Sequence, residues 1–369
     1  MTNDGGESEL LLNDNRKEEF RITGCMKLII SFFIILLGGL GFYMFHIFSI
    51  SSQCLNESPY LLVTSHSDRN VAKFDRVGCR IQEAVLWGGK PSQRGGLRSI
   101  VTGLYFNEPA LYVAATDKLK KRKVHSSIEV FGGCNAITGF RYHLKNAYNA
   151  KFNKSGSHPY GMTFDDEGNL YASFQHTDNV LRFYKDNFQP MPVPKAVNDG
   201  IVDGTISKQV PLGTFIQFGE PGVHVSKEQG VRAIAWADHA LWVANEDTNS
   251  VLILDAEGYT LKELFIHRPI GVQYIPELNQ VLISSKNKHK GDGGIYAYDV
   301  DSKELVKNYF HDDLVHPTGL VYYDSLLYIA EQTSNSIFVV DVNTGLMVDN
   351  LSIGKLLHGN IEQVALSDC

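Results

Sequence analysis

The sequence predicts an all-β fold, a six-bladed β-propeller closed by its C-terminal strand, and three observations support this prediction. First, short runs alternate between apolar and polar residues and end at turn-forming residues, as strands require. Second, these runs recur in groups of four, with a period of about 40 to 50 residues. Third, the first group lacks its first strand, while the chain ends on a first strand with nothing after it. We therefore expect the two ends of this region to complete one blade.

The clearest repeat unit spans residues 158–185. It contains three expected strands at 160–164, 170–174 and 179–184, and an acidic turn separates the first two. Similar units begin near residues 101, 230, 269 and 316, and a split unit combines 60–74 with 360–367. Six such units can close into a ring that leaves no free sheet edge.

This repeat pattern resembles the NHL-repeat family of six-bladed propellers and its gluconolactonase, paraoxonase and strictosidine-synthase-like relatives. The resemblance covers residues 60–369 and is specific for the fold, because one fold supports many activities. It implies that ligands bind at the face where the first strands begin. In the paraoxonase-like relatives a disulfide also closes the ring.

The N-terminal residues predict a membrane anchor. Residues 28–50 contain no Lys, Arg, Asp or Glu, and as a helix they would span roughly 34 Å. Positive residues precede this segment, and none follows until Arg69. The positive-inside rule then gives a cytoplasmic tail (1–27), a signal-anchor helix (28–50), a linker (51–59) and a luminal or extracellular propeller (60–369). The alternative is a cleaved signal peptide, for which the apolar segment is long.

The cysteines and glycosylation sequons agree with this topology. Four cysteines follow the apolar segment, an even number that suits a disulfide framework in an oxidising compartment and permits three pairings. If the last strand lies beside residues 60–65, Cys54 and Cys369 meet at the seam, where the resemblance also implies a bridge. Cys79 and Cys134 then form a second bridge or stay free thiols. The expected N-glycosylation acceptors are Asn56, Asn153 and Asn350.

The face away from the membrane is the expected partner-binding surface. It carries the residues before the first strands, His158, Arg268, His316 and Asn360, together with two lysine-rich loops near residues 118–123 and 286–290. We expect it to bind an anionic protein or glycan, such as a sulfated or sialylated chain, although two merely solvated loops would give the same pattern. The net charge of −7 argues against nucleic acid as a partner.

One residue of each first strand is expected to point into the central tunnel. In order of blades one to six these residues are Glu362, Thr102, Tyr160, Arg232, Ile270 and Thr318. Arg232 and Glu362 are the only charged pair, and they either orient a ligand or neutralise each other. If the chain is an enzyme of the lactonase or strictosidine-synthase-like type, Glu362 is the catalytic candidate, with Tyr160 and Arg232 beside it.

The ligand patterns for a metal cofactor are absent from the sequence. The resemblance implies a tunnel Asn before the Gly of each first strand for calcium, but Tyr160, Ile270 and Thr318 occupy those positions. Zinc-binding relatives use three His residues, which this register does not bring together. We therefore expect no calcium or zinc cofactor, and a binding or interaction module more than an enzyme. A scaffold without a small ligand is the third interpretation, if side chains block the tunnel.

Overall fold

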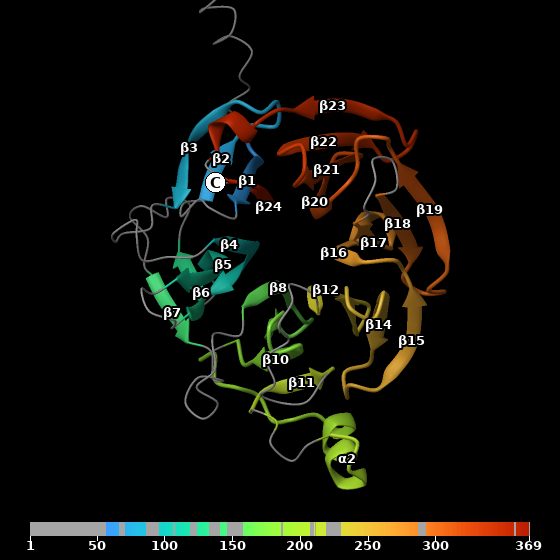
Figure 1. The fold of residues 1–369 in the computed structure, drawn as a ribbon. Coiled ribbons are helices and arrows are strands. Elements are labelled where there is room, and N and C mark those ends of the chain that lie inside the picture. Colours follow the sequence, from blue (N-terminus) through green and yellow to red (C-terminus); the bar gives the residue numbers. More distant parts are fainter. Residues whose placement is uncertain are drawn as a thin grey trace, which may run out of the picture. The chain divides into compact units, whose positions relative to one another are not determined.

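The computed structural model describes residues 57–368, except for 66–70, 86–95, 106–107, 119–123, 133–140, 146–157, 186, 207–209, 211, 219–229, 287–292 and 358. These residues belong to a compact unit, Asn56–Cys369. They form six four-stranded antiparallel sheets, the blades of the predicted propeller (Figure 1).

The first strand of each blade lies nearest the axis, and the first strands of neighbouring blades contact one another around the whole ring (Figure 1). In order of blades one to six they are β24 (Ile361–Ser367), β4 (Leu97–Tyr105), β8 (Pro159–Phe164), β12 (Val231–Ala237), β16 (Pro269–Ile275) and β20 (Pro317–Tyr323). The second strands are β1 (Tyr60–Ser65), β5 (Glu108–Lys118), β9 (Leu170–Phe174), β13 (Ala240–Asn245), β17 (Gln280–Ser285) and β21 (Leu326–Glu331).

The third and fourth strands complete each blade toward its outer edge. The third strands are β2 (Val71–Phe74), β6 (Val124–Gly132), β10 (Asn179–Phe183), β14 (Ser250–Leu254), β18 (Gly294–Asp299) and β22 (Ser336–Asp341). The fourth strands are β3 (Arg80–Val85), β7 (Arg141–Lys145), β11 (Thr214–Gln217), β15 (Thr260–Phe265), β19 (Leu305–Phe310) and β23 (Met347–Leu351).

The closure of the ring is confirmed. The C-terminal strand β24 pairs antiparallel with β1, from Tyr60 opposite Ser367 to Ser65 opposite Ile361. The split unit is therefore blade one, assembled from both ends of the propeller. Because Tyr60 and Ser367 lie together, the chain enters the propeller at the face where the first strands end.

The hydrophobic core lies between the blades. Among the described residues, each buried cluster joins two neighbouring sheets; for example, Tyr112 of blade two packs with Met162 and Leu181 of blade three. Matching clusters occupy the other five interfaces, including the one between blades six and one. Alternate residues of each strand thus pack on opposite neighbours, which explains why a single unit could not be stable alone.

Two elements differ from the sequence expectation. The first strand of blade two begins at Leu97, four residues before the expected start near 101. In blade three, residues between β10 and β11 form an insertion that contains the helix α2 (Lys195–Asp203). Pro194 precedes the helix and Gly204 follows it as the C-cap. The φ of 86° at Gly204 is a left-handed backbone conformation, which glycine adopts readily at the ends of right-handed helices.

Several sequence predictions fall on residues outside the described ranges. No helix among the described residues combines the length and the apolar composition that a bilayer crossing needs, and residues 28–50 lie outside them. Cys54, Cys134 and Cys369, with Asn56 and Asn153, also lie outside the described residues. Cys79, in the turn between β2 and β3, is disulfide-bonded.

Candidate functional site

One residue from each first strand forms a buried layer across the axis. Near its start every first strand has a register irregularity against its partner, for example between Pro159 and Met162 in β8. The residue next to the first paired one is therefore equivalent in all blades. In order of blades one to six these residues are Glu362, Arg98, Tyr160, Arg232, Ile270 and Thr318.

This set, the axial layer, corrects one sequence prediction. Thr102 was expected in blade two, but the register places Arg98 there, and Thr102 lies four residues further along β4. The short stretch Thr102-Gly103 imitates the Tyr160-Gly161 pattern of blade three. The better signal was the match of residues 96–100, Gly-Leu-Arg-Ser-Ile, to residues 230–234, Gly-Val-Arg-Ala-Ile.

The axial layer is filled by charged side chains that interact with one another. Arg98 Nη1 lies 2.6 Å from Glu362 Oε1, and the exposed fractions of these side chains are 11% and 2%. Gln332 Nε2 donates to the same carboxylate oxygen at 3.1 Å. Arg232 lies over the Tyr160 ring, 4.9 Å from its centroid. Tyr160, Arg232 and Glu362 therefore lie in one layer, and Arg98 is a partner of Glu362 that the sequence analysis did not name.

A second buried carboxylate, absent from the sequence prediction, binds two arginines. Glu246 follows β13, and its Oε2 accepts a hydrogen bond from Arg232 Nε at 2.7 Å. Its Oε1 accepts one from Arg268 Nε at 2.9 Å. The Glu246 side chain is fully buried. A charge-assisted pair of this kind is stable in the interior only because both oxygens are satisfied.

Serine side chains from two second strands hydrogen-bond the backbones of neighbouring first strands and hold them together at the axial layer. Ser173 Oγ accepts from Gly161 N at 2.7 Å and donates to the Arg232 carbonyl of the next blade. Ser284 Oγ repeats this arrangement, accepting from Gly271 N at 2.7 Å and donating to the Thr318 carbonyl at 3.1 Å. Neighbouring first strands thus approach closely, and the glycines leave room for them.

The His residues before the first strands do not form one cluster. His158 packs against His176 with ring centroids 4.3 Å apart. His316 donates its backbone N–H to Glu331, and its side chain is hydrogen-bonded to Gln332. Burial, and then the charges of Lys286, Arg232 and Arg268, lower the pKa of His316 to about 3. Among the described residues, no group of three His, Cys, Asp or Glu side chains could hold a metal ion.

An Asp or Asn after the second strand fixes the start of the next blade. Asp178 Oδ1 accepts from Val231 N at 2.9 Å, Asn249 Oδ1 from Arg268 N at 3.0 Å, and Asn335 Oδ1 from Ile361 N at 2.8 Å. All three residues have φ between 52° and 57°, where Asn and Asp are favoured. Burial raises the pKa of Asp178 to about 6.

These residues define two faces of the propeller. The charged face is the one where the first strands begin, and it carries His158, Arg268 and His316 with the Glu246 pairs. The turn face is the opposite one, where tight turns join the strands. Many of these turns begin with an Asp whose side chain accepts backbone N–H groups, such as Asp165, Asp255 and Asp341.

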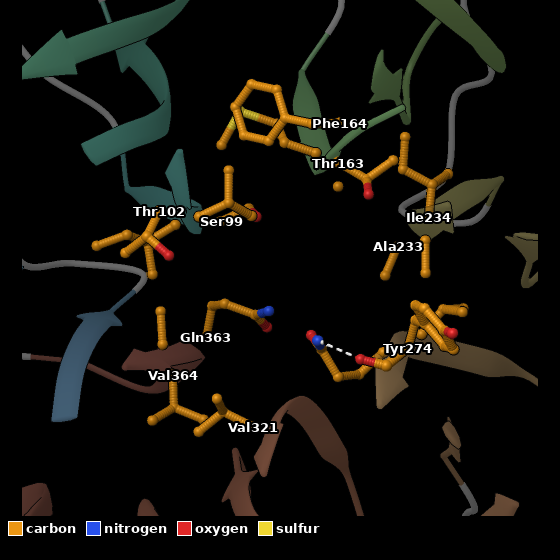
Figure 2. A pocket seen from close by; sticks show the side chains of 18 of the residues that line it. Ser99, Thr102, Thr163, Phe164, Ala233, Ile234, Tyr274, Val321, Gln363 and Val364 are labelled. Carbon is orange, nitrogen blue, oxygen red and sulfur yellow. Dashed lines mark hydrogen bonds between the residues drawn. The ribbon is translucent and has the colours of Figure 1, made fainter. Parts of the chain in front are cut away.

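A cavity of about 290 Å³ occupies the axis on the turn-face side of the axial layer (Figure 2). First strands of all six blades line it, and Arg98 and Tyr160 close one end. Gln363 points toward its centre, while Thr102, Thr163 and Tyr274 lie around it (Figure 2).

The fold is similar to that of solved propeller structures. A chain of the nidogen/laminin complex is 12% identical, with a TM-score of 0.56, covering 84% of this chain and 98% of that one. A protein of unknown function from Bacteroides caccae is 11% identical, with a TM-score of 0.52 and coverage of 84% and 98%. A virginiamycin B lyase from Staphylococcus aureus with quinupristin is 12% identical, with a TM-score of 0.47 and coverage of 81% and 86%. No family model and no curated protein matches the sequence.

Proposed function

We propose that the chain is a single-pass type II membrane protein whose propeller acts as a binding module in the secretory-pathway lumen or outside the cell. Its partner, a protein or glycan with an anionic group, binds at the charged face. The direction of the strands supports this arrangement, because the chain enters the propeller at the turn face. The charged face lies at the opposite end of the same strands.

The observation that carries this proposal is the shared counter-ion at the charged face. Glu246 pairs with both Arg232 and Arg268, so one carboxylate contacts two guanidinium groups. Lys286 adds a further positive charge near His316, which is why these three cations disfavour the charged form of that imidazole. Glu331, close by, is satisfied by backbone N–H groups of Val315, His316 and Thr333. These cations would attract a carboxylate or sulfate group of a partner.

Binding of the full-length protein to a glycan array tests this proposal. The protein is kept in a detergent without a sugar headgroup, and the array presents sulfated, sialylated and neutral glycans. We expect the anionic glycans to bind, with affinity falling as salt rises. The double variant Arg268→Gln/Lys286→Gln should lower the affinity at least about tenfold, which corresponds to about 1.4 kcal/mol.

The matched control is Lys185→Gln, an exposed lysine that follows β10 on the turn face and should leave binding unchanged. Equal binding of neutral and anionic glycans, or equal loss in the control, would contradict anion recognition at the charged face. An acidic polyglutamate peptide, measured in the same way, distinguishes a protein partner from a glycan.

The membrane topology has its own test. Asn350 and Ser352 of the third sequon are both exposed on the outer strand β23 and the residues after it, so a luminal transferase can reach them. We expect digestion with an N-glycosidase to increase the gel mobility of the full-length protein made in mammalian cells. Asn350→Gln should remove one glycan. A chain without any glycan would place the propeller on the cytoplasmic side and overturn this topology.

The convergence of Tyr160, Arg232 and Glu362 also suits the alternative, a propeller enzyme. Against it, Arg98 and Gln332 already engage Glu362, and burial raises the pKa of the Tyr160 hydroxyl. A binding module that uses the loops at the rim tolerates Glu362→Gln. An enzyme would lose its activity through that change alone.

A further inference from the structure

The axial cavity is chemically unlike the charged face. The described residues of its lining include no carboxylate, and the charged residue among them, Arg98, is already paired with Glu362. A charged ligand would lose its hydration here without gaining a counter-ion, which is costly in an enclosed site. The lining therefore selects for a neutral ligand.

Polar groups inside the cavity have unused hydrogen-bonding capacity. The Gln363 amide points toward the centre (Figure 2), and within the described part of the chain no hydrogen bond engages it. The Ser99 and Thr102 hydroxyls also line the cavity. An amide and two hydroxyls can each donate and accept, a combination that matches the hydroxyl groups of a sugar.

Three aromatic side chains also belong to the lining, at the same level along the strands as Thr102. Phe164, Trp236 and Tyr274 are half-buried near the ends of β8, β12 and β16. Such rings bury the apolar face of a ligand, while a few placed polar groups orient it. The volume of about 290 Å³ is at the lower limit for small-molecule sites, which suits one or two sugar rings.

We propose that the axial cavity is a binding site for a neutral mono- or disaccharide. Gln363, Ser99 and Thr102 bind its hydroxyl groups, and the aromatic side chains pack against the ring. The site is reached from the turn face, where Thr102 is exposed. It is separate from the anion site of the proposed function, because the axial layer lies between the two.

Titration of the full-length protein with glucose, galactose, N-acetylglucosamine and lactose tests the site, in a detergent without a sugar headgroup. Trp236 lines the cavity, so tryptophan fluorescence reports occupancy, and calorimetry gives the affinity. We expect at least one of these sugars to bind saturably below about 50 mM, with an affinity in the range of weak small-ligand sites. Glucuronate should bind at least about tenfold more weakly than glucose, because the cavity offers no free counter-charge.

Two variants and two controls locate the binding. Gln363→Leu keeps the volume but removes the amide, and should weaken binding about tenfold through two lost hydrogen bonds. Thr102→Phe should block the cavity, and the exposed position lets the variant fold. Leu104→Phe is the matched control, since Leu104 is exposed on the same strand but does not line the cavity. The Arg268→Gln/Lys286→Gln variant should also bind sugar normally.

Three results would overturn the proposal: no binding by any of the four sugars, unchanged binding in both Gln363→Leu and Thr102→Phe, or glucuronate binding as tight as that of glucose. A tetrasaccharide that ends in the bound sugar distinguishes the sources of the ligand. Tighter binding of the tetrasaccharide indicates the tip of a glycan, and tighter binding of the free sugar indicates a soluble saccharide.

Discussion

The two ends of the propeller axis use the same six first strands but have opposite chemistry. Toward the charged face, the axial layer contains two arginines and a glutamate, and it is closely packed. Toward the turn face, the axis is hollow and its lining is neutral. The difference follows from what surrounds each end. At the charged face, loops after the second strands bring in Glu246 and Gln332 as partners for charged side chains. At the other face, the described turns keep their carboxylates outside the lining; Asp166, for example, accepts a hydrogen bond from Trp236 Nε1 at 3.0 Å.

The largest effect in this comparison should come from removing the shared counter-ion. Glu246→Ala removes the carboxylate that joins the buried Arg232 to the half-buried Arg268, and we expect it to lower the free energy of unfolding by about 3–5 kcal/mol. Urea unfolding followed by circular dichroism measures the change. The control is Glu257→Ala, an exposed acidic residue of the same blade that should change stability by less than about 0.5 kcal/mol. Similar losses in both variants would show that the axial charges do not depend on Glu246.

A smaller loss should follow from separating neighbouring first strands. A Cβ atom on Gly271 would lie 1.9 Å from the Thr318 carbonyl oxygen, which belongs to the backbone of the next blade and cannot turn away. We expect Gly271→Ala to destabilise the protein by about 2–3 kcal/mol, as other overpacked positions do. Ala233 is the equivalent residue of blade four, so Ala233→Gly should cost less than about 1 kcal/mol. Thermal unfolding of the two variants compares them, and equal stability would mean that the strands are not in close contact.

The smallest of the three effects should come from replacing Asp178. Unlike the other two substitutions, it should stabilise the protein, and its effect should depend on pH. Burial raises the pKa of this carboxyl to about 6, with a further contribution from Asp247, so the folded state holds the proton more tightly than the unfolded one. The contribution of Asp178 to the free energy of unfolding is therefore fully present below the pKa of the unfolded state, near 3.8. It is lost as the pH rises through about 6, the pKa of the folded state.

Asp178→Asn keeps the acceptor for Val231 N without the charge. We expect it to stabilise the protein by about 1–2 kcal/mol at pH 7.5 and to have no effect below pH about 4. The reciprocal change, Asn335→Asp, should destabilise the protein more at high pH than at low pH. If the free energy of unfolding of each variant differed from that of the original protein by the same amount at all pH values, a buried carboxyl with a raised pKa at this position would be contradicted.

The sequence identified the repeat but misplaced one member of the axial layer. Local alternation and turn residues were enough to find five whole units and one split unit, because both signals depend on neighbouring residues. In blade two a Thr-Gly pair imitated the expected pattern, while the true position, Arg98, follows Gly96-Leu97. The register irregularity against β5 places Arg98, and strand pairing decides that register.

Glu246 shows what the sequence analysis missed at the site. It lies in the loop after β13, where the sequence alone predicts an exposed glutamate. Its side chain is instead fully buried and pairs with two arginines. The equivalent position carries Gln175 in blade three and Gln332 in blade six, so a comparison of units at this position could have indicated its place beside the axis.

By itself, the sequence determined the all-β class, the six blades and the strand that closes the ring. These features follow from the two-residue period of strands and from the positions of turns, which the chain encodes locally. The tertiary structure decided which side chains meet. Arg98 and Glu362 are 264 residues apart and pair only because the ring closes. The neutral cavity is equally nonlocal, since six strands each contribute part of its lining and only their packing leaves it open.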